Sequence, residues 1–184
     1  MSDSREPIVG VLALQGDFQA HAALLRALGA GVREVRVRGD LAGLDALVLP
    51  GGESTTMMLG IDRETLAEPL RELAARVPVL GTCAGMILLD RAHLGVLDMV
   101  CARNAFGRQV RSFEGDVKLD GFDAPFHGVF IRAPWVDEHG EAVAVLGAID
   151  GHPVAVAAGR ILAVAFHPEL AGDGRLHRWL LDQL

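Results

Sequence analysis

The stretch that decides the fold of this chain is PVLGTCAGMILL, residues 78–89. It predicts an apolar strand over residues 78–81, then a turn in which glycines flank Cys83, then an apolar helix that starts near Gly85. A tight turn between a strand and a helix exposes the side chain at its tip. The pattern G-x-C-x-G is the cysteine counterpart of the nucleophile elbow of serine hydrolases. A buried cysteine in a glycine-rich turn fits an isolated match equally well.

The segments before this turn alternate between strand-like and helix-like patterns. Apolar runs predict strands over residues 8–14, 32–37 and 46–49, and helical spacing predicts helices over residues 18–28 and 66–77. Ser54 or Thr55 is expected to cap a further helical segment after the third strand. This alternation favours parallel strands joined by right-handed crossovers. The sequence therefore predicts an α/β fold with a three-layer, doubly wound, mostly parallel sheet, whose active site lies beyond the C-terminal ends of the strands.

Beyond residue 95 the strand-like pieces are separated by glycine, proline and aspartate. They cover residues 115–119, 128–131, 142–149, 153–158 and 161–166. This change predicts a mixed or antiparallel extension of the sheet. A closing helix is expected over residues 175–184, with Leu176, Trp179, Leu180 and Leu184 on its apolar side. Because no repeat or linker interrupts the chain, residues 1–184 are predicted to form one domain.

Composition and charge exclude several classes of function. The 184 residues are 51% hydrophobic, carry a formal net charge of -7 and include a single lysine, Lys118. Such a chain has no basic stripe with which to bind a nucleic-acid backbone. The polar start lacks the pattern of a secretory signal, and charged residues interrupt the apolar stretch 142–166. We therefore expect a cytoplasmic protein that contacts neither nucleic acid nor membrane.

Cysteine usage predicts neither a disulfide framework nor a metal site. The chain has two cysteines, and it contains no CxxC motif or cysteine and histidine cluster. Cys101 lies inside the apolar run 96–102 and is expected to be a buried spectator. No cofactor is predicted.

A second chemical motif, His167-Pro168-Glu169, follows the last predicted strand. The imidazole and the carboxylate are two positions apart, so both can face the same side. With Cys83 they form a candidate Cys-His-Glu triad, in which His167 is the base and Glu169 orients its ring. The alternative is a histidine that merely ends a strand. We expect that structural role for the other six histidines: His21, His93, His127, His139, His152 and His177.

A glycine loop, PGGESTT at residues 50–56, follows the third strand at the edge of the sheet where Cys83 is expected. Bare glycines let backbone N–H groups approach a ligand, so Gly52 could form an oxyanion hole together with the N–H of Ala84. A plain turn with a helix cap is the competing interpretation. A phosphate loop is set aside because the lysine of the Walker motif is missing.

Six segments together resemble one family, the triad-type (class I) glutamine amidotransferases, and within it the glutaminase subunits of pyridoxal 5'-phosphate synthase. The segments are LQG (14–16), LPGGESTTM (49–57), GTCAG (81–85), RNAFGRQ (103–109), GVFIRAP (128–134) and FHPEL (166–170). The triad is shared by the whole superfamily, whereas the GGESTT, RNxFGRQ and FIRAP motifs are far more specific. One segment departs from the pattern, because only Asp90-Arg91-Ala92 separates the helix after Cys83 from His93-Leu94-Gly95.

The resemblance implies a reaction, a substrate and a partner. Cys83 would attack the side-chain amide of L-glutamine and release ammonia, while His167 and Glu169 move the protons. By motif position the residues that bind glutamine would be Gly52, Glu53, Ser54, Arg103, Ile131 and Arg132. A guanidinium suits a carboxylate because its fork can bind both oxygens. The ammonia would pass to a barrel-shaped synthase subunit in a large assembly that makes the vitamin B6 cofactor.

Three alternatives to this interpretation stay open at the level of sequence. The chain could be the glutaminase of another synthase, in histidine or purine biosynthesis. It could be a DJ-1-like regulatory cysteine protein without glutaminase activity, although the HPE motif and the glycine loop are both intact. A cysteine peptidase is the third alternative, but nothing in the sequence indicates an extended peptide groove.

Overall fold

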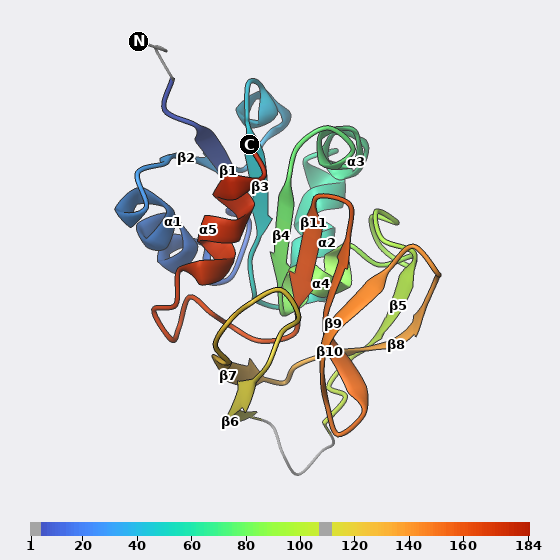
Figure 1. Ribbon diagram of the computed structural model, residues 1–184. Coiled ribbons are helices and arrows are strands. Elements are labelled where there is room, and N and C mark those ends of the chain that lie inside the picture. The colour runs from blue at the N-terminus through green and yellow to red at the C-terminus, as the bar shows by residue number, and fades with distance from the viewer. Residues whose placement is uncertain (1–4, 107–111) are drawn as a thin grey trace.

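A central sheet of seven strands organises the computed structural model, which describes residues 5–106 and 112–184 (Figure 1). The strand order is β2-β1-β3-β4-β11-β10-β9. Within this order the strands from β2 to β11 run parallel, and β10 and β9 are antiparallel to their neighbours. The strands are β1 (Ile8–Leu12), β2 (Gly31–Val35), β3 (Ala46–Leu49), β4 (Val79–Thr82), β9 (Ala144–Ile149), β10 (His152–Ala158) and β11 (Ile161–Val164).

Helices cover both faces of this sheet. Helices α1 and α5 lie on one face, and α2, α3 and α4 lie on the other (Figure 1). Every residue of β3 and β4 is buried, as expected for parallel strands that are covered on both sides. The helices are α1 (Phe18–Ala27), α2 (Ser54–Arg63), α3 (Ala67–Ala74), α4 (Ala84–Leu88) and α5 (Arg175–Asp182), with a 3-10 turn η1 (Arg38–Leu41).

Two small antiparallel pairs sit beside the sheet. Strand β5 (Met99–Ala102) pairs with β8 (Trp135–His139), and β6 (Ser112–Val117) pairs with β7 (Phe126–Ile131). Phe106 joins the two pairs, because its ring meets Phe130 of β7 and Trp135 of β8 edge-on. Within the second pair, Phe113 stacks on Phe130 at 4.5 Å between centroids. The end of β7 reaches the central sheet where the backbone N–H of His167 donates to the carbonyl of Val129 at 2.9 Å.

The observed architecture confirms the predicted α/β class, with a mostly parallel sheet and an antiparallel extension. Several local predictions were wrong. Helix α2 is capped by Glu53 and not by Ser54 or Thr55. The Glu53 carboxylate accepts hydrogen bonds from backbone N–H groups in the first turn of the helix, which have no partner within the helix. The second strand ends at Val35, where the Asp40 carboxylate accepts from the N–H groups of Arg36 and Val37 and turns the chain.

Two expectations about apolar side chains also need correction. Helix α5 ends at Asp182, so Leu184 lies beyond it and is 54% exposed. Cys101, expected to be buried, is only partly so, because the short strand β5 lies outside the central sheet. Among the described residues, no helix is long and apolar enough to span a membrane.

Candidate active site

Cys83 sits at the tip of the turn between β4 and α4, where it is buried and not exposed as the turn predicts, although it lines a cavity. Its φ is 47°, in the left-handed region that residues with a Cβ rarely adopt. Strained backbone of this kind is concentrated at functional sites. The turn can be this tight because Gly85 has no side chain: a Cβ there would lie 1.9 Å from the carbonyl oxygen of Leu49. Cys83 Sγ lies 3.8 Å from the carbonyl oxygen of Ile131.

The pairing of β4 with β11 places His167 beside this turn. The two strands are parallel neighbours, with Thr82 opposite Val164, so the residues that follow them leave the sheet at the same edge. His167 Nδ1 lies 2.7 Å from Glu169 Oε1, and both side chains are buried. Gly51 makes room for the ring, because a Cβ at that position would be 2.2 Å from His167 Cε1. The structure thus brings together the three predicted triad residues.

The protonation states of His167 and Glu169 are set by their interactions with neighbouring side chains. Burial alone would lower the pKa of His167, but its interactions with Cys83 and Glu169 outweigh burial and raise that pKa to about 10. Burial would raise the pKa of Glu169, yet the hydrogen bond from His167 and the nearby His21 lower it to about 2. At neutral pH the ring is therefore an imidazolium that faces a carboxylate on one side and the cysteine sulfur on the other. This is the partner that a thiolate nucleophile needs.

Two buried histidines that the sequence interpretation treated as structural lie behind Glu169. His21 Nε2 is 3.3 Å from Glu169 Oε2 and 3.1 Å from Thr82 Oγ1. His21 Nδ1 is 2.8 Å from His177 Nε2. A signal for both was present: His21 falls on the stripe of α1 that contains Leu25, and His177 falls on the buried side of α5.

A cavity of about 290 Å³ opens in front of Cys83 and His167. All the predicted binding residues line it, namely Gly52, Glu53, Ser54, Arg103, Ile131 and Arg132, and so does Ala84. Three further lining residues come from the loop between β1 and α1 and were missed: Gln15, Gly16 and Asp17. Gln15 and Gly16 belong to the LQG motif, which by itself predicts no role in the site. Gln15 Oε1 accepts from the Glu53 N–H at 2.6 Å and so ties that loop to the glycine loop.

The side chain of Glu53 is committed to its own helix. It accepts from the N–H groups of Thr55 and Thr56 at 3.0 and 2.8 Å. The Thr56 hydroxyl donates to it as well, and these bonds lower the pKa of Glu53 to about 2. This carboxylate is an ionised helix cap on the wall of the cavity.

Part of one motif cannot be placed. Arg103 to Phe106 of the RNAFGRQ segment are described, whereas Gly107, Arg108 and Gln109 lie outside the described residues. One possible ligand atom each from Asp17, His167 and Glu169 lies within 4.8 Å of the others. His167 Nδ1 already bonds Glu169, so a cation bound there would displace the triad hydrogen bond.

Comparison with known proteins agrees with this geometry. A family model described as "SNO glutamine amidotransferase family" matches residues 11–184. The chain belongs to this family. It is 52% identical to "Pyridoxal 5'-phosphate synthase subunit PdxT" of Mycolicibacterium vanbaalenii, over 97% of this chain and 98% of that protein. It is 53% identical to the protein of the same name from Frankia alni, over 96% and 94% of the two chains.

Solved structures give the same result. A crystal structure of a glutamine amidotransferase matches with a TM-score of 0.89 and 46% identity, covering 95% of this chain and 97% of that one. A structure of PurLQS from Thermotoga maritima has a TM-score of 0.72 at 18% identity, over 97% and 99% of the two chains, which is a likeness of fold alone. Family membership confirms the resemblance drawn from the motifs and the expectation of a glutamine-hydrolysing enzyme, and it argues against the DJ-1-like and peptidase alternatives.

Proposed function

We propose that this protein hydrolyses L-glutamine to L-glutamate and ammonia at Cys83, as the glutaminase subunit of a pyridoxal 5'-phosphate synthase. The observation that carries the proposal is the geometry of the cavity. A cysteine on a strained elbow faces an imidazolium that is held by a buried carboxylate 2.7 Å away. The near full-length similarity to PdxT proteins of two genera supports this synthase rather than one of histidine or purine biosynthesis.

The reaction follows from the three side chains. The Cys83 thiolate, paired with the His167 imidazolium, adds to the side-chain amide carbon of glutamine, and the oxygen gains negative charge that the N–H groups of Gly52 and Ala84 stabilise. His167 gives its proton to the departing nitrogen, the C–N bond breaks, and ammonia leaves a γ-glutamyl thioester. His167 then takes a proton from water, which attacks the thioester and releases glutamate and the thiolate. Glu169 keeps the ring oriented and stabilises its charged form throughout.

The remaining residues of the cavity hold the substrate. Arg103 and Arg132 supply guanidinium groups for the carboxylate end of glutamine. Ile131 borders the space next to Cys83, and Gly52, Glu53 and Ser54 line the side of the glycine loop. Because the Glu53 carboxylate caps α2 and the Glu53 N–H donates to Gln15, Glu53 contributes by fixing the shape of this wall of the cavity.

The product ammonia defines the partner. We propose that it passes to a barrel-shaped synthase subunit within a large hetero-oligomer, in the cytoplasm, where the vitamin B6 cofactor is built. Neither nucleic acid nor membrane has a part in this function.

The proposal is tested by glutamate release from the purified protein, alone and with its cognate synthase subunit. We expect weak activity alone, a rise when the synthase is added, and loss of activity in Cys83→Ser and in His167→Asn. Cys101→Ser is the matched control, because Cys101 lies in β5 and its pKa is raised to about 12 by burial. Undiminished activity of Cys83→Ser would refute the mechanism. Activation only by an unrelated synthase would refute the pathway.

A further inference from the structure

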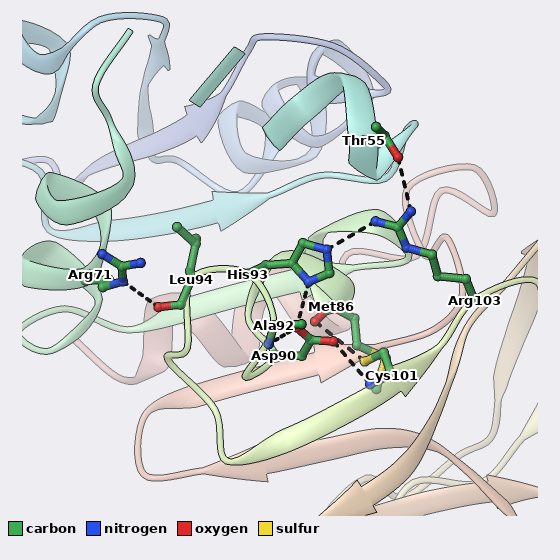
Figure 2. Close-up of polar contacts among 9 residues, drawn as sticks. All are labelled: Thr55, Arg71, Met86, Asp90, Ala92, His93, Leu94, Cys101 and Arg103. Atoms are coloured by element: carbon green, nitrogen blue, oxygen red, sulfur yellow. Dashed lines mark hydrogen bonds and ion pairs between the residues drawn. The ribbon is translucent and has the colours of Figure 1, made fainter. Parts of the chain in front are cut away.

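Arg103 is an exposed arginine whose guanidinium is nevertheless held from two sides (Figure 2). One terminal nitrogen donates to Thr55 Oγ1 at 3.1 Å, in the first turn of α2. The other lies 3.1 Å from His93 Nε2. A free arginine on a protein surface samples many rotamers, and binding a ligand has to order it. The contacts with Thr55 and His93 order the Arg103 side chain before any ligand binds.

The charge and tautomer of His93 follow from its two neighbours. A guanidinium has only donors, so His93 Nε2 must accept and carries no proton. His93 Nδ1 lies 2.6 Å from Asp90 Oδ1, a carboxylate oxygen, and therefore donates its proton there. Arg103 thus donates a hydrogen bond to the neutral ring of His93, and His93 donates one to the Asp90 carboxylate.

Asp90 is fixed by the protein around it. It is 1% exposed, and its Oδ1 also accepts from the Ala92 N–H at 2.9 Å while its Oδ2 accepts from the Cys101 N–H at 3.2 Å. The far end of the same turn is tied to α3, because Arg71 Nε donates to the Leu94 carbonyl at 2.6 Å. A buried carboxylate with these backbone partners is a rigid base for His93.

These contacts give a role to the short segment Asp90-Arg91-Ala92, which departs from the family pattern. We propose that Asp90 and His93 are positioning residues that hold Arg103 in the orientation needed to bind the carboxylate end of glutamine. The inference rests on the proposed function in one respect, the use of Arg103 for substrate binding. Arg103 touches the substrate, whereas His93 acts through Arg103 and Asp90 acts through His93.

Two substitutions of His93 separate this role from general support of the turn. Asn at position 93 can still donate to Asp90 from the place of Nδ1, but it is too short to reach Arg103. Gln can place its amide oxygen near the position of Nε2 and accept from Arg103. We expect His93→Asn to raise KM for glutamine about two- to tenfold, the cost of ordering one long side chain, with a smaller change in kcat. His93→Gln should lie nearer to the wild type.

A double-mutant cycle with Arg103→Met tests whether His93 acts through Arg103. Assays use the protein together with its synthase, and the exposed histidine variant His139→Asn is the matched control, expected to keep the wild-type KM. If the inference is right, His93→Asn adds nothing to the KM of Arg103→Met. Additive effects would overturn it, as would Gln and Asn variants with equal KM.

A spectroscopic readout keeps the inference independent of activity. In the ¹⁵N NMR spectrum of the histidine side chains, the His93 signal, assigned by its loss in His93→Asn, should show protonated Nδ1 and bare Nε2. Arg103→Met should shift the Nε2 resonance. A protonated Nε2 would overturn the tether even if glutamine hydrolysis is normal. Conversely, activity that survives Cys83→Ser refutes the proposed function while the His93 signal still reports the tether. If Arg103→Met leaves KM unchanged, Arg103 does not bind the substrate. This inference then fails, whereas the proposed function stands.

Discussion

At the scale of single residues, His21 occupies the side of Glu169 that His167 leaves free. The carboxylate therefore has a nitrogen near each oxygen, at 2.7 Å and 3.3 Å, and neither oxygen faces water. The hydrogen bond of His21 Nε2 goes to Thr82 Oγ1 at 3.1 Å, and Glu169 Oε2 has no hydrogen-bond donor among the described residues. His21 therefore acts on Glu169 through its proximity, as a polar ring nitrogen 3.3 Å from a buried carboxylate oxygen.

Replacing His21 should weaken the triad in a way that depends on the replacement. His21→Leu replaces the ring nitrogen 3.3 Å from the buried Glu169 Oε2 with an apolar side chain, so we expect kcat to fall. His21→Gln keeps a polar N–H group of similar reach and should recover much of the activity. Since His21 helps to lower the pKa of Glu169, its loss should move the acid limb of the pH profile of kcat to higher pH in His21→Leu. Identical profiles for His21→Leu and wild type would contradict a positioning role.

At the scale of elements, α5 closes the site from behind. It packs over β4 with Leu176 and Leu180 buried, and it places His177 against His21. Burial and the neighbouring His21 lower the pKa of His177 to about 3, so the ring stays neutral in the folded protein. The unfolded chain, with an ordinary histidine, binds a proton below about pH 6.5. Between these values acidification favours unfolding.

This linkage predicts the pH dependence of stability. From pH 6.5 to about pH 5 the wild type should lose on the order of 1 to 2 kcal/mol more unfolding free energy than His177→Gln, which lacks the titrating ring. The window excludes Glu169, whose pKa of about 2 matters only at lower pH. It also excludes His167, whose raised pKa affects stability above pH 6.5. Urea unfolding at several pH values measures the difference, and parallel losses in both proteins would disprove the linkage.

The sequence predicted those elements whose patterns are local. Strand β3 is fully apolar and fully buried, and it was predicted to the residue. The positions of Cys83 and His167 follow from motifs that come directly after the strands β4 and β11. The Glu53 cap was missed because a longer carboxylate competed with two hydroxyl residues for the same N–H groups. The link from Glu169 to His177 was not predictable, because it depends on how α1 and α5 pack together on one face of the sheet.

At the scale of the whole molecule, the extension and the central sheet share one packed interior. Trp135 of β8 stacks on His152 of β10 with ring centroids 3.6 Å apart, which joins the two parts. Apolar residues of both parts belong to one continuous hydrophobic cluster. We propose on this basis that residues 1–184 unfold as a single unit.

The two tryptophans make this testable, since Trp135 reports on the extension and Trp179 on α5. In Trp179→Phe only the extension emits tryptophan fluorescence, and in Trp135→Phe only α5 does. Each variant should show the same urea midpoint by fluorescence and by far-UV circular dichroism, as two-state unfolding requires. A fluorescence midpoint that departs from the circular dichroism midpoint in either variant would instead indicate two units.

The pairing of β4 with β11 also bears on how the protein is made. Chains leave the ribosome from the N-terminus, so Cys83 emerges long before His167. The base reaches the thiol only after β11 has taken its place between β4 and β10. While residues 84–166 are being added, the nascent chain therefore carries Cys83 without its catalytic partners. The order of synthesis delays the assembly of the triad until β11 has joined the sheet.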